Sequence, residues 1–139
     1  MGMVEDVQMF LAQYSPAIID GSTGWPSVRR RVHDDSDQLV VLTEDGGFEP
    51  ETPSAEGLGD SALKQPAVQV RVRGEPWDSD ASYEKAQEIM DALHGVMRQD
   101  VGYGYYLRIK AQTSGPVFIG FDDRGRPEHT ISFRAVQAA

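Results

Sequence analysis

Residues 67–74 read Ala-Val-Gln-Val-Arg-Val-Arg-Gly, and this stretch decides the fold. Its apolar and polar residues alternate, which is typical of a strand with one buried face, because successive side chains of a strand point to opposite sides. The three valines predict a side that faces the core, and Arg71 and Arg73 predict a polar side. The stretch is the clearest strand in the chain.

A long helix is predicted directly after this strand. Asp78 and Asp80 complement the positive end of a helix dipole, and Ser79 between them can cap the first turn. Apolar residues then recur at helical spacing and form one stripe, which consists of Tyr83, Ala86, Ile89, Met90, Leu93 and Met97. We expect this stripe to pack on the valine side of the strand.

The other segments predict a second helix and several short strands. The further helix covers Met3–Tyr14 and ends before Pro16. The expected strands are a short one near Val28–Val32, a buried one at Gln38–Thr43, and three after Gly104 at Tyr105–Ala111, Val117–Phe121 and Thr130–Val136. This order predicts one α+β domain over residues 1–139, with an antiparallel-rich sheet, the long helix packed on one face and an N-terminal helix.

The segment Asp45–Pro66 has a different composition. It contains three prolines and four glycines, and few apolar residues anchor it. Acidic residues accumulate in and beside it without any basic residue among them: Glu44, Asp45, Glu49, Glu51, Glu56 and Asp60. A segment of this kind cannot offset its ordering entropy by burying apolar surface, so we expect a flexible acidic loop.

Bulk composition favours protein partners. The chain has 22 acidic and 13 basic residues and a formal charge of −9, which disfavours a general binder of nucleic acid or anionic membranes. It contains no cysteine, so disulfides, thiolate metal sites and thiol nucleophiles are excluded. The sequence has neither a secretory signal nor an apolar run long enough to cross a membrane. A reducing compartment such as the cytoplasm suits this composition.

No set of residues predicts an enzyme. His33, Asp34 and Asp35 offer metal-ligand chemistry, but adjacent residues of a polar loop rarely converge on one point. Gly102-Tyr103-Gly104 lacks the third glycine and the helix of a dinucleotide-binding loop, and we interpret it as a turn. The run Arg29–Arg31 could contact phosphate, but the nearby aspartates favour a locally neutralised surface. No catalytic, cofactor-binding or metal-binding residue is predicted.

Several consecutive segments resemble a known family, the phage minor capsid proteins that act as tail terminators of long-tailed phages (siphophages). The segments that carry the resemblance are Leu39–Glu44 followed by Gly46-Gly47, Pro66–Gly74, the helix Tyr83–Gly95, and Asp122–Arg126 followed by Ile131–Arg134. Their order and spacing match over residues 38–136. None of these segments is diagnostic alone, but the series in this order is specific.

The resemblance implies a structural protein of the virion tail, assembled in the host cytoplasm. Such proteins form a ring, usually a hexamer, that caps the tail tube, stops its polymerisation and forms the head-tail joining surface. The implied partners are the tail tube protein and a head-tail connector protein, with DNA passing through the ring lumen, and neither catalysis nor a cofactor is implied. Two alternatives stay open: another connector component, such as a head-closure protein, and a small ligand-binding or enzymatic domain.

Alternation along the strands predicts a subunit interface for such a ring. Five basic residues are expected on the sheet face opposite the long helix: Arg71, Arg73, Arg108, Lys110 and Arg134. We expect this face to meet acidic residues of a neighbouring subunit, with Glu49 and Glu51 as the candidates. The competing interpretations are a solvated sheet face and a surface that contacts DNA in the lumen.

Overall fold

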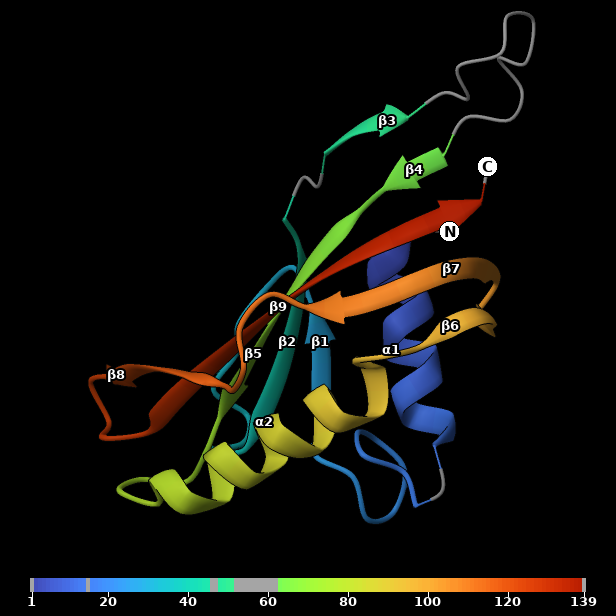
Figure 1. Cartoon of the computed structure of the whole chain (residues 1–139). Helices are drawn as coiled ribbons and strands as arrows, with labels where there is room; N and C mark the ends of the chain where they lie inside the picture. Colours follow the sequence, from blue (N-terminus) through green and yellow to red (C-terminus); the bar gives the residue numbers. More distant parts are fainter. Residues whose placement is uncertain (1, 15, 46–47, 52–62, 139) are drawn as a thin grey trace, which may run out of the picture.

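The sheet is built around its last strand. In the computed structural model, which describes residues 2–14, 16–45, 48–51 and 63–138, β9 (Pro127–Ala138) is 12 residues long and is paired along both edges (Figure 1). On one edge it pairs with β5 (Ala67–Arg73) and then with β4 (Leu63–Gln65). On the other edge it pairs with β8 (Val117–Phe121) and then with β7 (Gly104–Ala111).

The remaining strands extend this arrangement into one mixed sheet. β2 (Leu39–Glu44) pairs with β5, β1 (Ser27–Arg29) with β2, β3 (Phe48–Glu51) with β4, and β6 (Met97–Val101) with β7. Among the pairings between the described strands, only β1–β2 is parallel. The helices α1 (Met3–Gln13) and α2 (Ser79–Leu93) complete the described part of the chain. The predicted α+β class with an antiparallel-rich sheet is confirmed.

One hydrophobic cluster joins both helices to the inner face of the sheet. α1 contributes Val4, Val7 and Leu11, and the three valines of β5 are fully buried. α2 adds Ala86, Ile89, Met90 and Leu93, as its apolar stripe predicts. Burial of this apolar surface is the main favourable term that holds helices and sheet together.

The long helix is shorter than its apolar stripe predicts. It ends at Leu93, and the amide of His94 closes it by a hydrogen bond to the Met90 carbonyl at 2.8 Å. Gly95 follows with φ of 90°, a conformation that ends helices. Met97 therefore opens β6 and is 64% exposed, and Tyr83 at the other end of the stripe is half exposed. The expectation that these two side chains face the core is wrong.

The acidic segment Asp45–Pro66 is not a loop throughout. Two strands, β3 and β4, lie near its ends and widen the sheet beside the last residues of β9. Their pairing uses backbone hydrogen bonds, which require no apolar alternation, so the sequence pattern missed them. Residues 46–47 and 52–62, on which the expectation of flexibility mainly rests, lie outside the described residues.

A buried carboxylate fixes α1 to the β6–β7 turn. Asp6 accepts hydrogen bonds from the Tyr103 amide at 2.9 Å and from the Tyr106 hydroxyl at 2.7 Å. Burial and this hydrogen bond raise the pKa of the Tyr106 phenol. A Cβ atom on Gly102 would lie 2.5 Å from the backbone of Asp6, and one on Gly104 would lie 2.7 Å from its carboxylate. The two glycines are thus required by the close approach of α1, and not by a nucleotide.

The packing of α2 on the sheet predicts a large effect at Leu93, which is fully buried. We expect Leu93→Ala to lower the free energy of unfolding by about 2–5 kcal/mol, because truncation leaves a cavity in the core. Glu84→Ala on the exposed side of the same helix should change it by less than about 0.5 kcal/mol. Urea melts of the three proteins measure both effects. Equal stability of Leu93→Ala and the parent would contradict this packing.

Candidate functional site

Three of the five predicted basic residues converge on one surface. Lys110 of β7 lies directly opposite Arg134 of β9, and Arg108 lies opposite Val136. These side chains alternate with the buried Ile109 and Ala135, so they point away from the core. Arg108 and Lys110 are exposed, and Arg134 is half-buried. We call Arg108, Lys110 and Arg134 the basic cluster.

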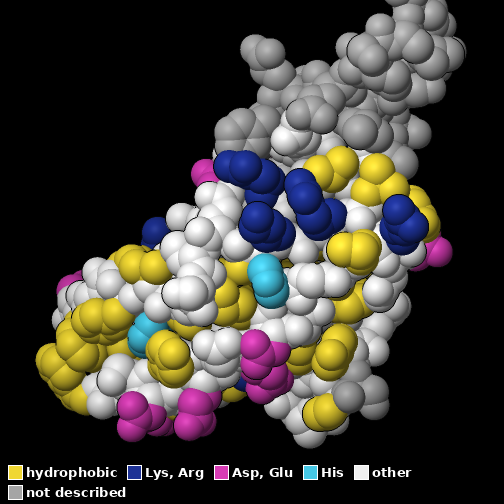
Figure 2. Space-filling model, in the orientation of Figure 1, with side chains coloured by type: hydrophobic (Ala, Val, Ile, Leu, Met, Phe, Trp, Pro, Cys, Tyr) yellow, Lys and Arg dark blue, Asp and Glu magenta, His cyan; other side chains and the backbone are white. Residues whose placement is uncertain are grey.

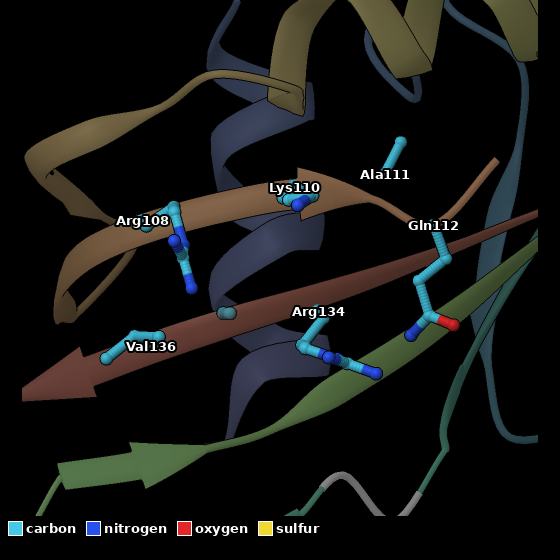
Figure 3. A pocket seen from close by; sticks show the side chains of 7 residues that line it. Arg108, Lys110, Ala111, Gln112, Arg134 and Val136 are labelled. Carbon is cyan, nitrogen blue, oxygen red and sulfur yellow. The ribbon is translucent and has the colours of Figure 1, made fainter. Parts of the chain in front are cut away.

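The basic cluster surrounds a shallow pocket of about 280 Å³. Figure 3 shows the three side chains around the pocket, with Gln112 at its rim and α1 on the far side of the sheet. Figure 2 shows Lys and Arg side chains gathered in this region of the molecule. Among the described residues, neither Arg108 nor Lys110 has an ion-pair partner. The surface can therefore bind an anionic group such as a carboxylate or a phosphate.

Arg71 contributes less positive charge to this side of the sheet than the residues of the basic cluster do. It lies on the β5 side of β9 and is 3.7 Å from the carboxylate of Glu128, which partly neutralises it. Its side chain is partly exposed, as the strand alternation predicts. Arg71 thus shares the polar side of the sheet with the basic cluster but has an acidic partner within its own chain.

Arg73 is not a surface residue, which corrects its predicted role in the interface. Its side chain is buried and donates hydrogen bonds to the carbonyl groups of His33, Ser36 and Asp37 at 2.6–3.0 Å. Burial lowers the pKa of its guanidinium. The loop 33–37 covers this end of β5, so Arg73 fixes the loop and is inaccessible to a neighbouring subunit.

A second buried arginine, Arg126, was missed by the sequence analysis. Its guanidinium donates to Asp122 and to Asp34, both at 2.7 Å, and lies 3.6 Å from Asp37. These contacts join the β8–β9 turn to the loop that Arg73 also holds. The hydrogen bond from Arg126 lowers the pKa of Asp34. The spacing Asp122-x-x-x-Arg126 was the available signal, but the partner Asp34 is 92 residues away.

The structure describes the backbone of the predicted acidic residues Glu49 and Glu51 but not their side chains. Glu49 and Glu51 belong to β3, and their side chains lie outside the described part of the chain. Glu44 is occupied within the chain, because Arg30 donates hydrogen bonds to its carboxylate and to that of Glu5. Arg29 and Arg30 of the arginine run are therefore neutralised by glutamates of α1 and β2, and not by the neighbouring aspartates as expected.

The histidines occupy structural positions. His94 accepts a hydrogen bond from the Ala111 amide at 3.0 Å, which joins the end of α2 to β7. His129 lies 2.8 Å from the hydroxyl of Ser82, and both side chains are buried. Burial lowers the pKa of His129. Within the ranges that the structure describes, no three acidic or histidine side chains are grouped as a metal site, and no helix is long and apolar enough to span a membrane.

The comparison with known families identifies the class of protein. A family described as "Bacteriophage tail terminator protein" matches residues 13–138, which is nearly the whole chain. The chain belongs to this tail terminator family. Among curated proteins there is no match. The resemblance found in the sequence is confirmed, and it extends further towards the N-terminus than the segments that first carried it.

Membership in the terminator family gives this chain a structural role in the phage tail. The family is a class of structural virion proteins rather than of enzymes, and its members associate with tail and head components. The candidate site of this terminator is accordingly a binding surface. The basic cluster is a candidate for part of such a surface.

The different environments of Arg71 and Arg73 predict different effects of truncation. We expect Arg73→Ala to lower the free energy of unfolding by about 1.5–3 kcal/mol, because three carbonyl groups lose a charged donor. Arg71→Ala removes an exposed ion pair and should cost less than about 1 kcal/mol. Chemical denaturation distinguishes the two variants. A harmless Arg73→Ala would mean that the loop 33–37 does not depend on this side chain.

Acid should weaken the contact between Asp34 and Arg126. Since the folded protein lowers the pKa of Asp34 below its ordinary value of 3.8, the contact contributes stability above that pH. The contribution is lost as the pH falls through the lowered value. We expect Asp34→Asn to unfold more readily than the parent near neutral pH and to show a smaller loss of stability in acid. Urea midpoints measured across the acid range compare the two slopes, and identical slopes would contradict the assignment.

Proposed function

We propose that this chain is a non-enzymatic ring subunit that caps the tail tube, stops its polymerisation and forms the surface that joins tail to head. Membership in the terminator family supports the role in the tail. The ring, usually of six subunits in this family by the resemblance described above, meets the tail tube protein on one side and a connector protein on the other. Assembly in the host cytoplasm is consistent with a chain that contains no cysteine.

The basic cluster is the observation that supports assembly. Lys110 and Arg134 lie directly opposite each other on neighbouring strands, and like charges in this arrangement repel. A chain with a formal charge of −9 has many carboxylates, yet none of those described pairs with Arg108 or Lys110. A neighbouring copy can supply the missing carboxylates, and contacts of this type set both orientation and specificity. The basic cluster therefore forms one half of the proposed subunit interface.

Glu49 and Glu51 on β3 remain the acidic half that the sequence predicts. β3 lies at one end of the sheet order, and an edge strand of this kind offers backbone groups to another molecule, which supports the proposal. Arg71 has a secondary role in this proposal, because Glu128 already pairs with it. Arg73 has no role in it, because it is buried.

The same basic cluster could instead contact DNA in the ring lumen, since phosphate and carboxylate groups are bound by the same cations. The two possibilities differ in what charge reversal does. Loss of a subunit contact abolishes the ring, whereas loss of a DNA contact leaves the ring intact and removes salt-sensitive DNA binding.

We expect the double variant Arg108→Glu, Lys110→Glu to remain folded but to lose the oligomer, because both cationic side chains become anionic and repel the approaching carboxylates. Light scattering after size-exclusion chromatography measures the mass, and electron microscopy of the parent should show rings of tube-like diameter. The parent oligomer should also weaken as salt screens the contact. Arg31→Glu is the control, because this exposed side chain lies outside the basic cluster.

Further reversal of Glu49 and Glu51 to Lys in the double variant should partly restore the ring if β3 supplies the acidic half. Rings of normal size and salt stability in the original double variant would refute the interface. If those rings also fail to bind DNA that the parent binds, the cluster faces the lumen.

A further inference from the structure

A second exposed surface lies at the opposite end of β9 from the basic cluster. Six large apolar side chains on β8, the β5–α2 connection and the start of α2 have exposed fractions between 44% and 73%. We call them the hairpin surface: Trp77, Tyr83, Val117, Phe118, Ile119 and Phe121. Figure 2 shows hydrophobic side chains gathered at the lower left, where Figure 1 places β8. Contiguous exposed apolar side chains of this kind mark interaction sites.

The hairpin surface is held in place before any partner binds. The ring of Phe121 packs against Trp77 at 4.9 Å and against Phe118 at 5.3 Å between centroids. Phe118 in turn packs against the buried His129 at 5.2 Å. The Trp77 ring lies so close to Gly125 that a Cβ there would be 2.6 Å from it. Because these aromatic side chains are already ordered, binding through them costs little conformational entropy.

The strand that carries much of the hairpin surface also has an open edge. β8 pairs only with β9 among the described strands, and its apolar side chains are exposed on both of its faces. Natural proteins usually blunt such an edge with charge or cover it. An apolar edge strand that keeps neither protection is typical of a surface that another chain covers.

Acidic residues flank the hairpin surface. Asp80 and Glu84 are exposed on the first turns of α2, and neither has an ion-pair partner within the described ranges. Asp80 also lines a pocket of about 360 Å³ together with Tyr83, Phe118 and Phe121. The hairpin surface thus combines aromatic side chains, a hollow and negative charge.

The region of the basic cluster also has exposed apolar side chains, but its charge is positive. Met97, Tyr103 and Tyr105 are 44–71% exposed on the β6–β7 hairpin, and Met97 lies directly opposite Arg108 in the strand register. We call these three residues the turn surface. It combines apolar side chains with the positive charge of the basic cluster, and it is therefore complementary to the hairpin surface in both respects.

We propose that the hairpin surface of one copy docks on the turn surface and basic cluster of the next copy, with Asp80 and Glu84 facing Arg108 and Lys110. β8 pairs with residues 127–130 of β9 and β7 with residues 133–137, so the two surfaces lie at opposite ends of one strand. Unlike surfaces at opposite ends of a subunit give head-to-tail contacts, which close into a ring when the rotation allows it. The proposal rests on the ring proposed above and replaces Glu49 and Glu51 by Asp80 and Glu84 as the acidic half.

Cysteine trapping tests the contact directly, because the chain contains no cysteine of its own. Phe118→Cys and Tyr105→Cys are made as two separate single variants, and Gln13→Cys on the exposed end of α1 is the control. Under mild oxidation at high protein concentration, the mixture of Phe118→Cys and Tyr105→Cys should give a crosslinked dimer. A mixture of either variant with Gln13→Cys should not give this dimer. Crosslinking no greater than with the control would overturn the proposal. This holds even if the parent is monomeric in dilute solution, because the experiment is done at high protein concentration.

Charge exchange gives an independent test. Asp80→Lys, Glu84→Lys in one chain and Arg108→Glu, Lys110→Glu in another should each abolish assembly. Equimolar mixing of the two should restore it, because every contact in an alternating ring then joins opposite charges. Both variants should melt near the parent temperature, since all four side chains are exposed.

The outcomes separate this inference from the proposed function. One outcome is that the Arg108→Glu, Lys110→Glu chain assembles with a Glu49→Lys, Glu51→Lys chain and fails to assemble with the Asp80→Lys, Glu84→Lys chain. In that case the inference is wrong, and the basic cluster still forms the interface. If the Arg108→Glu, Lys110→Glu chain assembles alone, the interface of the proposed function fails as well.

Discussion

The pairing of β9 on both edges is the constraint on which the rest of the structure depends. A single strand of 12 residues holds β5 and β4 on one edge and β8 and β7 on the other. The buried Ile131, Phe133 and Ala135 along it contribute to the common core of both helices. Because a paired strand of this length is stiff and spans roughly 35–40 Å, it sets the separation between the basic cluster and the hairpin surface. Neither surface can move relative to the other without breaking sheet hydrogen bonds.

Arginines of the same sequence pattern have different roles in this framework. Arg71 and Arg73 are two positions apart on one side of β5, yet one is partly exposed and the other is buried beneath the loop 33–37. Arg73 and Arg126 are held near each other by backbone carbonyls and aspartates, which offset the cost of removing two cations from water. Their contacts tie the loop to the β8–β9 turn. The contacts of Arg73 and Arg126 with the loop 33–37 therefore also hold the turn beside the hairpin surface. The same contacts bury Arg73, so that it cannot take part in the interface.

The sequence predicted those parts of the structure that depend on local alternation. β5 and β8 were placed almost to the residue, and the core side of α2 was right at Ile89 and Leu93. β3, β4 and β6 were missed, because they are held by backbone pairing to distant strands and carry no apolar period. Alternation correctly placed Arg108, Lys110 and Arg134 on one side, but it could not reveal the loop that covers Arg73. The hairpin surface was missed because Tyr83 was expected to pack inward.

The contact between Asp6 and Tyr106 joins residues 100 positions apart, and this separation has a consequence for synthesis. The carboxylate of Asp6 finds the Tyr103 amide and the Tyr106 hydroxyl only after β7 has left the ribosome, whereas the apolar side of α1 can already pack on β2 and β5. The fold is therefore completed late, because most of its contacts join distant segments, and a nascent chain stalled before β7 keeps the Asp6 carboxylate without its hydrogen-bond donors. We expect chaperones to bind such chains, because the contacts that fix the N-terminal helix include residues from the last third of the sequence.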